Sequence, residues 1–178
     1  MKFKLHTRAS APKDSQLLLD NSEKAFGMIP NLHAIMAESP PLLEAYQTLH
    51  TLFQQTQFDA EELTVVWQTI NIEHDCHYCV PAHEAIAVMM KIDRDILDAL
   101  RNRKPMPNEK LQALHITTLA LIQNRGRLNE NELDVFFSAG YEQVHLLEII
   151  LGISQKVMSN YVNHITQTPV DSVFAAFI

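Results

Sequence analysis

The sequence predicts an all-α protein, and three observations lead to this expectation. Only 4 of the 178 residues are glycine, and helices need fewer glycine turns than all-β folds do. Long runs rich in Val, Ile and Thr, which would indicate strands, are few. Capping residues and apolar side chains at helical spacing recur along the chain. Because 178 residues suffice for one substantial core but are few for two, we expect residues 1–178 to form a single domain of helices.

The first expected helices follow from local signals. Asp14 and Ser15 are capping residues for a helix over 13–27, which stops at Gly27. A short helix is expected over 31–38. Its last residue precedes a serine and a proline that are typical of the start of the next helix.

Two capping patterns open the following helices. Ser39 is the expected cap of a helix that has Pro40 at its first position, which is a favoured arrangement. Asp59 and Glu62 have the spacing of a capping box. The later expected helices pass through Ile86 and Met89, then run from Asp93 to Leu100, from Asn108 to Gly126, from Asn129 to Ala139 and from Gln143 to His164.

Charge and hydropathy limit the partners and the location. The formal net charge is −7, which argues against nucleic acid or an anionic membrane as the main partner. No apolar stretch of signal-peptide length precedes the first charges. The most apolar later run, LLEIILGI over 146–153, is too short to span a bilayer. We therefore expect a cytoplasmic protein.

The segment EHDCHYCVPAHEA, residues 73–85, holds the only two cysteines, Cys76 and Cys79, with His83 four residues after the second. On a helix these three side chains fall within about 60° of one another. Pro81 belongs in the first turn of a helix, so the helix should begin within 78–80 or be kinked there. Cys79 would then lie at the helix N-terminus, where the dipole favours a thiolate.

This pattern favours a redox-active dithiol in which His83 exchanges a proton with Cys79 and one sulfur resolves the adduct of the other. In a reducing compartment a disulfide staple is the less favoured interpretation, and it would close only a small loop. A zinc site would need Cys76, Cys79, His83 and one of His74, His77 or Glu73 as ligands. All four would come from one helix start, which is cramped for structural zinc. We expect neither a metal nor another cofactor.

The residues CHYCVPAH (76–83) resemble the C-x-x-C-x-x-x-H signature of the carboxymuconolactone decarboxylase superfamily, in its alkyl hydroperoxidase D-like branch. The resemblance extends over four further segments: FGMIPNLHAIMAESPPLLEAYQTL (26–49), KLQALHITTLALIQNRGRL (110–128), FFSAGYEQVHLLEIILGISQKVMSNYVNHI (136–165) and TPVDSVF (168–174). It implies an all-helical fold that assembles into trimers or hexamers. It also implies hydroperoxide reduction at a cysteine pair, with electrons from a disulfide-reducing partner.

Carried over by position, Cys76 and Cys79 match the redox cysteines and His83 the proton-relay histidine. The sequence departs from the family pattern at two positions. Thr64 stands where the peroxidases carry a glutamate twelve residues before the first cysteine, and Tyr78 stands where a histidine precedes the second. Other nearby side chains are candidates for the proton relay: Glu62, Gln68, Glu73 and His77.

The leading hypothesis is a peroxiredoxin-type antioxidant enzyme in which either cysteine attacks a peroxide. The alternative from another class is a non-enzymatic redox sensor or binding protein of the same fold, whose dithiol changes a partner contact. A decarboxylase acting on an anionic lactone is disfavoured, because no lysine or arginine lies between Phe53 and Met90, the region expected to line the site.

Overall fold

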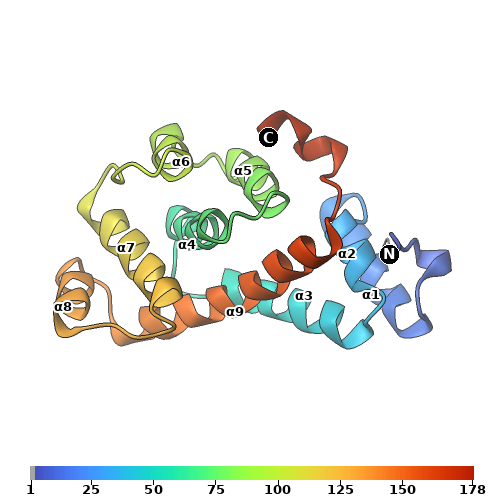
Figure 1. The fold of residues 1–178 in the computed structure, drawn as a ribbon, viewed down its shortest axis with the longest axis horizontal. Coiled ribbons are helices and arrows are strands. Elements are labelled where there is room, and N and C mark those ends of the chain that lie inside the picture. The colour runs from blue at the N-terminus through green and yellow to red at the C-terminus, as the bar shows by residue number, and fades with distance from the viewer. Residues whose placement is uncertain (1–2) are drawn as a thin grey trace.

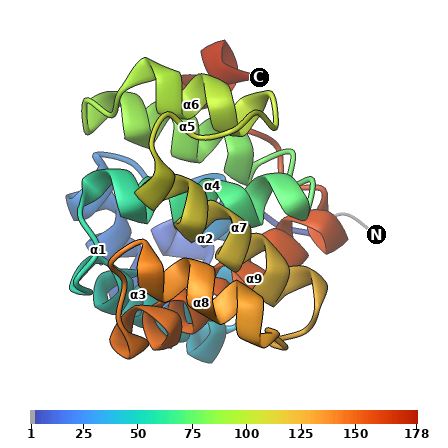
Figure 2. The ribbon, with the colours of Figure 1, turned by 90° about the vertical axis from the view of Figure 1, so that its left-hand side faces the viewer.

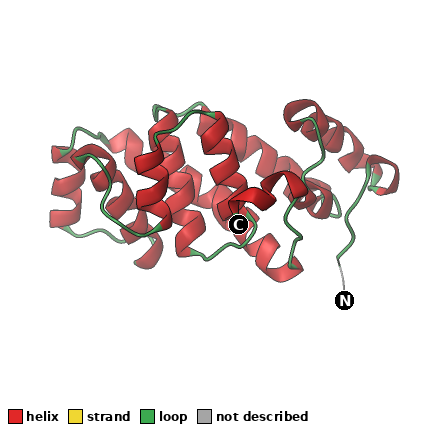
Figure 3. Cartoon of the chain, turned by 90° about the horizontal axis from the view of Figure 1, so that it is seen from above, coloured by secondary structure: helices red, strands yellow, loops and turns green. Residues whose placement is uncertain are grey.

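The structure, a computed structural model, describes residues 3–178. Throughout these residues the regular secondary structure is helical and no strand is present, which confirms the predicted all-α class (Figure 3). In chain order the described helices are η1 (Arg8–Ser10), α1 (Lys13–Phe26), α2 (Asn31–Met36), α3 (Pro40–Gln54), α4 (Ala60–Glu73), α5 (Cys79–Met89), α6 (Arg94–Arg101), α7 (Glu109–Gln123), α8 (Glu130–Ser138), α9 (Gln143–Thr166) and η2 (Ser172–Phe177).

Most of the predicted helix starts are confirmed. Asp59 and Glu62 form the capping box of α4, with reciprocal hydrogen bonds of 2.9 and 3.0 Å between side chain and backbone. Asn108 and Asn129 cap α7 and α8 by accepting from backbone N–H groups three residues on. Each cap satisfies a donor that the first turn of a helix leaves without a partner.

The predicted cap of the first helix is wrong. The N-cap of α1 is Pro12, and Asp14 and Ser15 lie inside the helix. Ser15 is buried, and its hydroxyl donates to the Ala37 carbonyl over 2.7 Å. A tertiary contact to the end of α2 therefore uses the side chain that local sequence assigns to capping. Gly27 ends the helix in the left-handed conformation, as predicted.

The long helix α9 runs across the molecule, from the side of α8 to the side of α2 (Figure 1). It packs against α3 and α4 and also contacts α2 and α5. On one side α7 lies against α4, with α8 beside α7 (Figure 2). At the other end the C-terminal helix η2 returns to α5.

Two clusters of buried apolar side chains form the core. The larger one lies between α4, α6, α7 and the first half of α9, and includes Phe53, Trp67 and Ile149. The smaller one lies between α1, α2, α3 and the start of α5, and includes both Cys76 and Cys79. The cysteines are thus part of the packed interior.

Candidate functional site

The cysteine segment connects α4 to α5 by a tight turn. Helix α4 ends at Glu73, and Asp75 adopts a left-handed backbone with φ of 50°. Helix α5 begins at Cys79 with Pro81 in its first turn, as the sequence predicts. The Cys79 N–H donates to the Cys76 Sγ over 3.3 Å. The N-terminal end of α5 therefore faces the Cys76 sulfur and brings the two cysteines together.

A row of buried polar side chains on α9 faces the sulfurs. Lys156, Ser159, Asn160 and Asn163, here called the α9 polar face, are all fully buried. Their spacing of three, four and seven residues places them on one side of a helix. The Asn163 amide nitrogen lies 3.2 Å from the Cys79 Sγ and 3.8 Å from the Cys76 Sγ. This face provides hydrogen-bond donors to sulfur in an otherwise apolar region.

The two thiols differ strongly in acidity. Burial raises the pKa of Cys79, but the Cys76 thiol, the Lys156 charge, Ser159 and Asn160 together bring it well below the usual cysteine value. The pKa of Cys76 is raised well above that value, because its hydrogen bond to Cys79 and its burial favour the thiol. One proton is thus shared unequally, and the Cys79 thiolate is the favoured ion.

His83 contacts Lys156 directly. The Lys156 Nζ lies 2.8 Å from the His83 Nε2, and an ammonium can only donate, so Nε2 accepts. Burial and the Lys156 charge hold the pKa of His83 well below its usual value. The imidazole is therefore neutral, and its ring packs on Trp67 with the centroids 5.0 Å apart.

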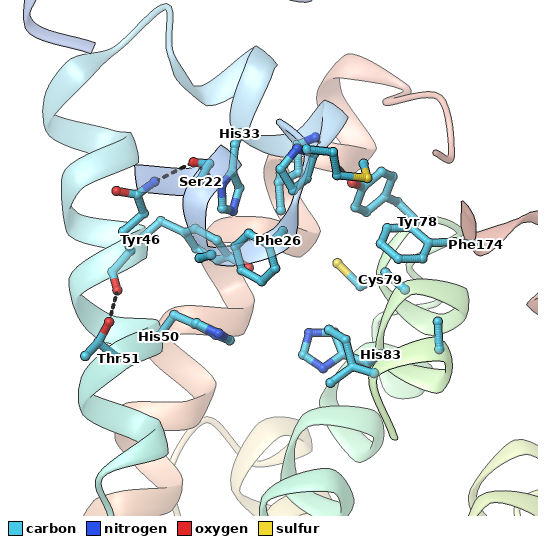
Figure 4. A pocket seen from close by; sticks show the side chains of 18 of the residues that line it. Ser22, Phe26, His33, Tyr46, His50, Thr51, Tyr78, Cys79, His83 and Phe174 are labelled. Atoms are coloured by element: carbon cyan, nitrogen blue, oxygen red, sulfur yellow. Dashed lines mark hydrogen bonds between the residues drawn. The ribbon is translucent and has the colours of Figure 1, made fainter. Parts of the chain in front are cut away.

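A cavity of about 1070 Å³ opens above this site. Cys79, His83 and Lys156 line it, and Cys76 does not. In Figure 4 the Cys79 sulfur and the His83 ring point from α5 towards His50 on α3, with Phe26 and Phe174 at the sides. The rest of the lining is largely apolar and includes Leu18, Met28, Ile86 and Met89.

His33 and His50 also line this cavity. Burial, with His50 as a second cause, lowers the pKa of His33 to about 3. Burial, with Lys156 as a second cause, lowers the pKa of His50 to about 4. Both are neutral bases at pH 7, and His50 stacks on Trp67 with centroids 5.5 Å apart. The cavity wall therefore combines apolar side chains with uncharged imidazoles.

The candidate relay carboxylates have partners away from the sulfurs. Glu62 is buried and pairs with Lys110 over 2.7 Å and with the Tyr141 hydroxyl over 3.0 Å. Glu73 accepts from Arg103 and Gln123. Neither carboxylate lines the cavity. Helix α4 ends at Glu73, so this carboxylate does not share a helix with the cysteines.

The other two relay candidates support the cysteine segment from outside the cavity. The His77 Nε2 bonds to the Thr168 carbonyl over 2.9 Å. Gln68 donates to the Val80 carbonyl over 3.1 Å and accepts from Asn71 over 2.9 Å. These contacts position the backbone at the start of α5.

The two positions that depart from the family pattern also have structural partners. Thr64 is buried and donates to the Ala60 carbonyl of its own helix over 2.8 Å. The Tyr78 hydroxyl donates to Asp171, and the same hydroxyl accepts from the Leu32 N–H over 3.4 Å. Tyr78 thereby holds the C-terminal segment next to α2 and the cysteines.

The α9 polar face was missed by sequence reasoning, and the expectation of no basic residue at the site is wrong. Lys156 comes from a helix more than 70 residues beyond the cysteines. The available signal was the run KVMSNYVN (156–163), in which Lys, Ser, Asn and Asn recur with helical spacing. Polar residues in one row of a long helix indicate either a solvated face or a buried site, and only the tertiary packing distinguishes the two.

The described part of the chain has neither a cluster of metal ligands nor a helix that could span a membrane. Residues 3–178 contain no group of three or more His, Cys, Asp or Glu side chains placed to hold a metal ion. None of the helices in this range combines the length and the hydropathy needed to cross a membrane.

Neither the models of known protein families nor the curated protein sequences include a match to this chain. Solved structures match almost its whole length. A peroxidase-related protein from Ralstonia eutropha JMP134, an alkylhydroperoxidase AhpD core of uncharacterized function, is 17% identical, with a TM-score of 0.84 over 97% of this chain and 93% of that one. A peroxidase-related protein from Silicibacter sp. TM1040 is 16% identical, with a TM-score of 0.81 over 98% and 92%.

A third similar structure is the debrominase Bmp8, as a cysteine-to-alanine variant in complex with 2,3,4-tribromopyrrole. It is 17% identical, with a TM-score of 0.81 over 99% of this chain and 95% of that one. At identities this low the likeness establishes the fold. The chain has the all-helical alkylhydroperoxidase D fold, as its motifs predict.

Proposed function

We propose that this protein is a dithiol redox enzyme that reduces organic hydroperoxides, with Cys79 as the attacking sulfur and Cys76 as the resolving sulfur. One observation supports these roles of the two cysteines. Cys79 faces the cavity and favours the thiolate, whereas Cys76 lies behind it and favours the thiol. A thiolate is the nucleophile of cysteine chemistry, and a neighbouring thiol can resolve the adduct that it forms.

The reaction proceeds in two balanced steps. The Cys79 thiolate attacks the terminal oxygen of the hydroperoxide, so that the O–O bond breaks, a sulfenic acid forms and an alkoxide leaves, which takes a proton. The Cys76 thiol then attacks the Cys79 sulfur, a disulfide forms and water is released. The peroxide gains two electrons and the dithiol loses two. A disulfide-reducing partner must return these electrons, and we propose such a partner as the donor.

The cavity supports an organic rather than an inorganic peroxide. Its volume of about 1070 Å³ is at the upper end of the range for sites of drug-sized molecules. Hydrogen peroxide would fill a small part of it and would leave the apolar walls uncovered. A hydroperoxide with a large apolar body would gain burial energy there.

The test compares cumene hydroperoxide with hydrogen peroxide, with dithiothreitol as reductant. We expect the unmodified protein to turn over cumene hydroperoxide faster. Cys79→Ser should be inactive, and Cys76→Ser should stop at a Cys79 sulfenic acid that mass spectrometry detects. Ser154→Ala, on the exposed side of α9, should keep full activity. Equal, slow consumption by all the variants would falsify the peroxidase function. Disulfide formation without turnover would instead favour the redox sensor.

A second candidate, reductive dehalogenation, is favoured by the aromatic and apolar walls around the Cys79 thiolate. The thiolate would take the bromine from an aryl bromide, and the carbanion would take a proton. The Cys76 thiol would then displace bromide and close the disulfide, so that two thiols and one C–Br bond give a disulfide, a C–H bond and hydrogen bromide. Incubation of the reduced protein with 2,3,4-tribromopyrrole tests this candidate, because it predicts one bromide released per disulfide formed.

We also propose that the protein forms homo-oligomers, trimers or hexamers, in the cytoplasm. Exposed apolar side chains on α9 support an interface between copies: Leu147, Ile150, Tyr161 and Ile165. Exposed apolar side chains that cluster on one face are typical of association sites. Light scattering after size-exclusion chromatography measures the mass, and a monomer would contradict this part of the proposal.

A further inference from the structure

Lys156 is a buried ammonium without a carboxylate partner. The residue is 0% exposed, and among residues 3–178 no Asp or Glu oxygen lies within 4.0 Å of its Nζ. Its hydrogen bond to the His83 Nε2 supplies an acceptor but no negative charge. A charge taken out of water without a counter-ion is strongly disfavoured. The charged form of Lys156 therefore requires an anion inside the site.

The sulfur of Cys79 is the group that can carry this negative charge. Lys156 and Cys79 line the same cavity, and Lys156 belongs to the α9 polar face, whose Asn163 lies 3.2 Å from the Cys79 sulfur. Burial lowers the pKa of Lys156, and the negative charges of the Cys79 and Cys76 thiolates oppose this effect. The titratable groups around the ammonium are Cys76, Cys79, His50 and His83.

We propose that Lys156 is a catalytic residue of the dithiol site, as the counter-ion of the Cys79 thiolate and the proton donor to the leaving group. His83 is then a positioning residue that holds the ammonium by accepting its hydrogen bond. The counter-ion role does not depend on the substrate. The proton-donor role rests on the proposed function.

The protons of both steps balance when Lys156 has this role. The ammonium protonates the alkoxide released by attack of the Cys79 thiolate, and the neutral amine remains. This amine takes the proton of the Cys76 thiol and passes it to the hydroxide that leaves the sulfenic acid. One hydroperoxide, one thiol, one thiolate and one ammonium thus give an alcohol, a water molecule, a disulfide and a neutral amine. The ammonium reforms when the disulfide is reduced.

A consequence for the reduction potential follows. The ammonium stabilises the reduced protein through its thiolate and has no anionic sulfur to stabilise in the disulfide. Lys156 should therefore make the Cys76–Cys79 disulfide more oxidising, as a stabilised thiolate does in other C-x-x-C proteins.

The test titrates the Cys79 thiolate by its ultraviolet absorbance in a Cys76→Ser background, which leaves one thiol and retains a hydroxyl donor. With Lys156 present we expect the Cys79 pKa to lie below neutrality. With Lys156→Met it should rise to or above the free-thiol value of about 8.5. The thiolate fraction at pH 7 should fall at least about tenfold. In the two-cysteine protein the same tenfold change corresponds to a potential about 30 mV lower.

Two comparisons make the result decisive. His83→Gln in the same background should keep a low Cys79 pKa, because the charge remains. Lys156→Gln, which keeps a donor to His83 without the charge, serves if the methionine variant does not fold. A low pKa that survives loss of Lys156, or an ordinary thiol pKa with Lys156 present, overturns the proposal. This titration uses no peroxide, so its result does not depend on the outcome of the peroxidase assay.

Discussion

The two halves of α9 each bury one face but differ in the chemistry of that face. In the first half, Ile149 and Gly152 pack into the larger apolar cluster. A Cβ at Gly152 would lie 2.8 Å from the Phe53 ring and 3.0 Å from a Val66 methyl, so the helices approach as closely as glycine permits. In the second half, the polar face from Lys156 to Asn163 occupies the equivalent inward position.

This difference separates packing from function within one helix. The first half has the side chains that a stable core favours, since close-packed apolar groups lower the free energy of the folded state. The second half buries polar groups that stability alone does not favour. Asn163 illustrates the cost, because its Oδ1 atom is buried without a hydrogen-bond partner within residues 3–178. Its amide nitrogen is directed at the sulfurs instead.

The largest effect should come from the apolar half. Gly152→Val places a branched side chain against the Phe53 ring, which is fully buried. We expect the free energy of unfolding to fall by about 3 kcal/mol, as measured by urea denaturation. Ser154→Ala, at an exposed position of the same half, should change it by less than about 0.5 kcal/mol. If Gly152→Val left the free energy of unfolding unchanged, α9 and α3 could move apart without cost.

In the polar half, we expect a substitution to raise the free energy of unfolding instead of lowering it. In the oxidised protein the thiolate is absent, so Lys156→Met replaces a buried amine that has no anionic partner with an apolar side chain of similar length. We expect the free energy of unfolding to rise by about 1–4 kcal/mol, measured on the disulfide form at neutral pH. A loss of stability similar to that of Gly152→Val would mean that Lys156 is part of the packing rather than a functional charge.

Acid should weaken the cavity side of the structure. The pKa values of His33 and His50 fall from about 6.5 in the unfolded chain to about 3 and about 4 in the folded one. Between these values the unfolded chain binds more protons, so stability falls as the pH falls from 6.5 to about 4 for both groups, and to about 3 for His33 alone. The expected slope is about 1.4 kcal/mol per pH unit for each histidine.

Urea denaturation over this pH range measures the slope. His33→Asn removes one of the titrating groups and should reduce the slope by about 1.4 kcal/mol per pH unit. An unchanged slope would show that His33 is protonated at an ordinary pH in the folded protein, or that other groups dominate.

The smallest effect should come from Asn163. Its uncharged amide donates a hydrogen bond to the Cys79 sulfur, which should favour the thiolate by about 1.5 kcal/mol. Asn163→Leu should therefore raise the Cys79 pKa by roughly one pH unit, much less than Lys156→Met does. The same thiolate absorbance detects it. An effect as large as that of Lys156→Met would indicate that hydrogen bonds, rather than the ammonium, stabilise the thiolate.

The fold and the position of the cysteines could be predicted because their signals are local. The capping box at Asp59 and Glu62, the cap at Asn108 and Pro81 in a first turn each depend on residues within one helical turn. The approach of Cys76 to the start of α5 follows from the same short segment.

The surroundings of the sulfurs could not be predicted in this way. Lys156 and Asn163 reach the cysteines only because α9 packs against α4 and α5. This packing joins helices that are distant in the sequence, so local patterns do not predict it. Glu62 looked available for proton transfer in the sequence, but Lys110 and Tyr141 from other helices hold it elsewhere. Residues close to a motif in the chain are thus poor guides to the residues that surround it in space.

The burial of Cys76 has a practical consequence for handling the protein. Cys76 is 0% exposed and does not line the cavity, so maleimide probes used to count free thiols should miss it in the folded state. A native-gel mobility assay would then score a fully reduced sample as if it were partly oxidised. Quenching in acid, followed by labelling after denaturation, would distinguish the two.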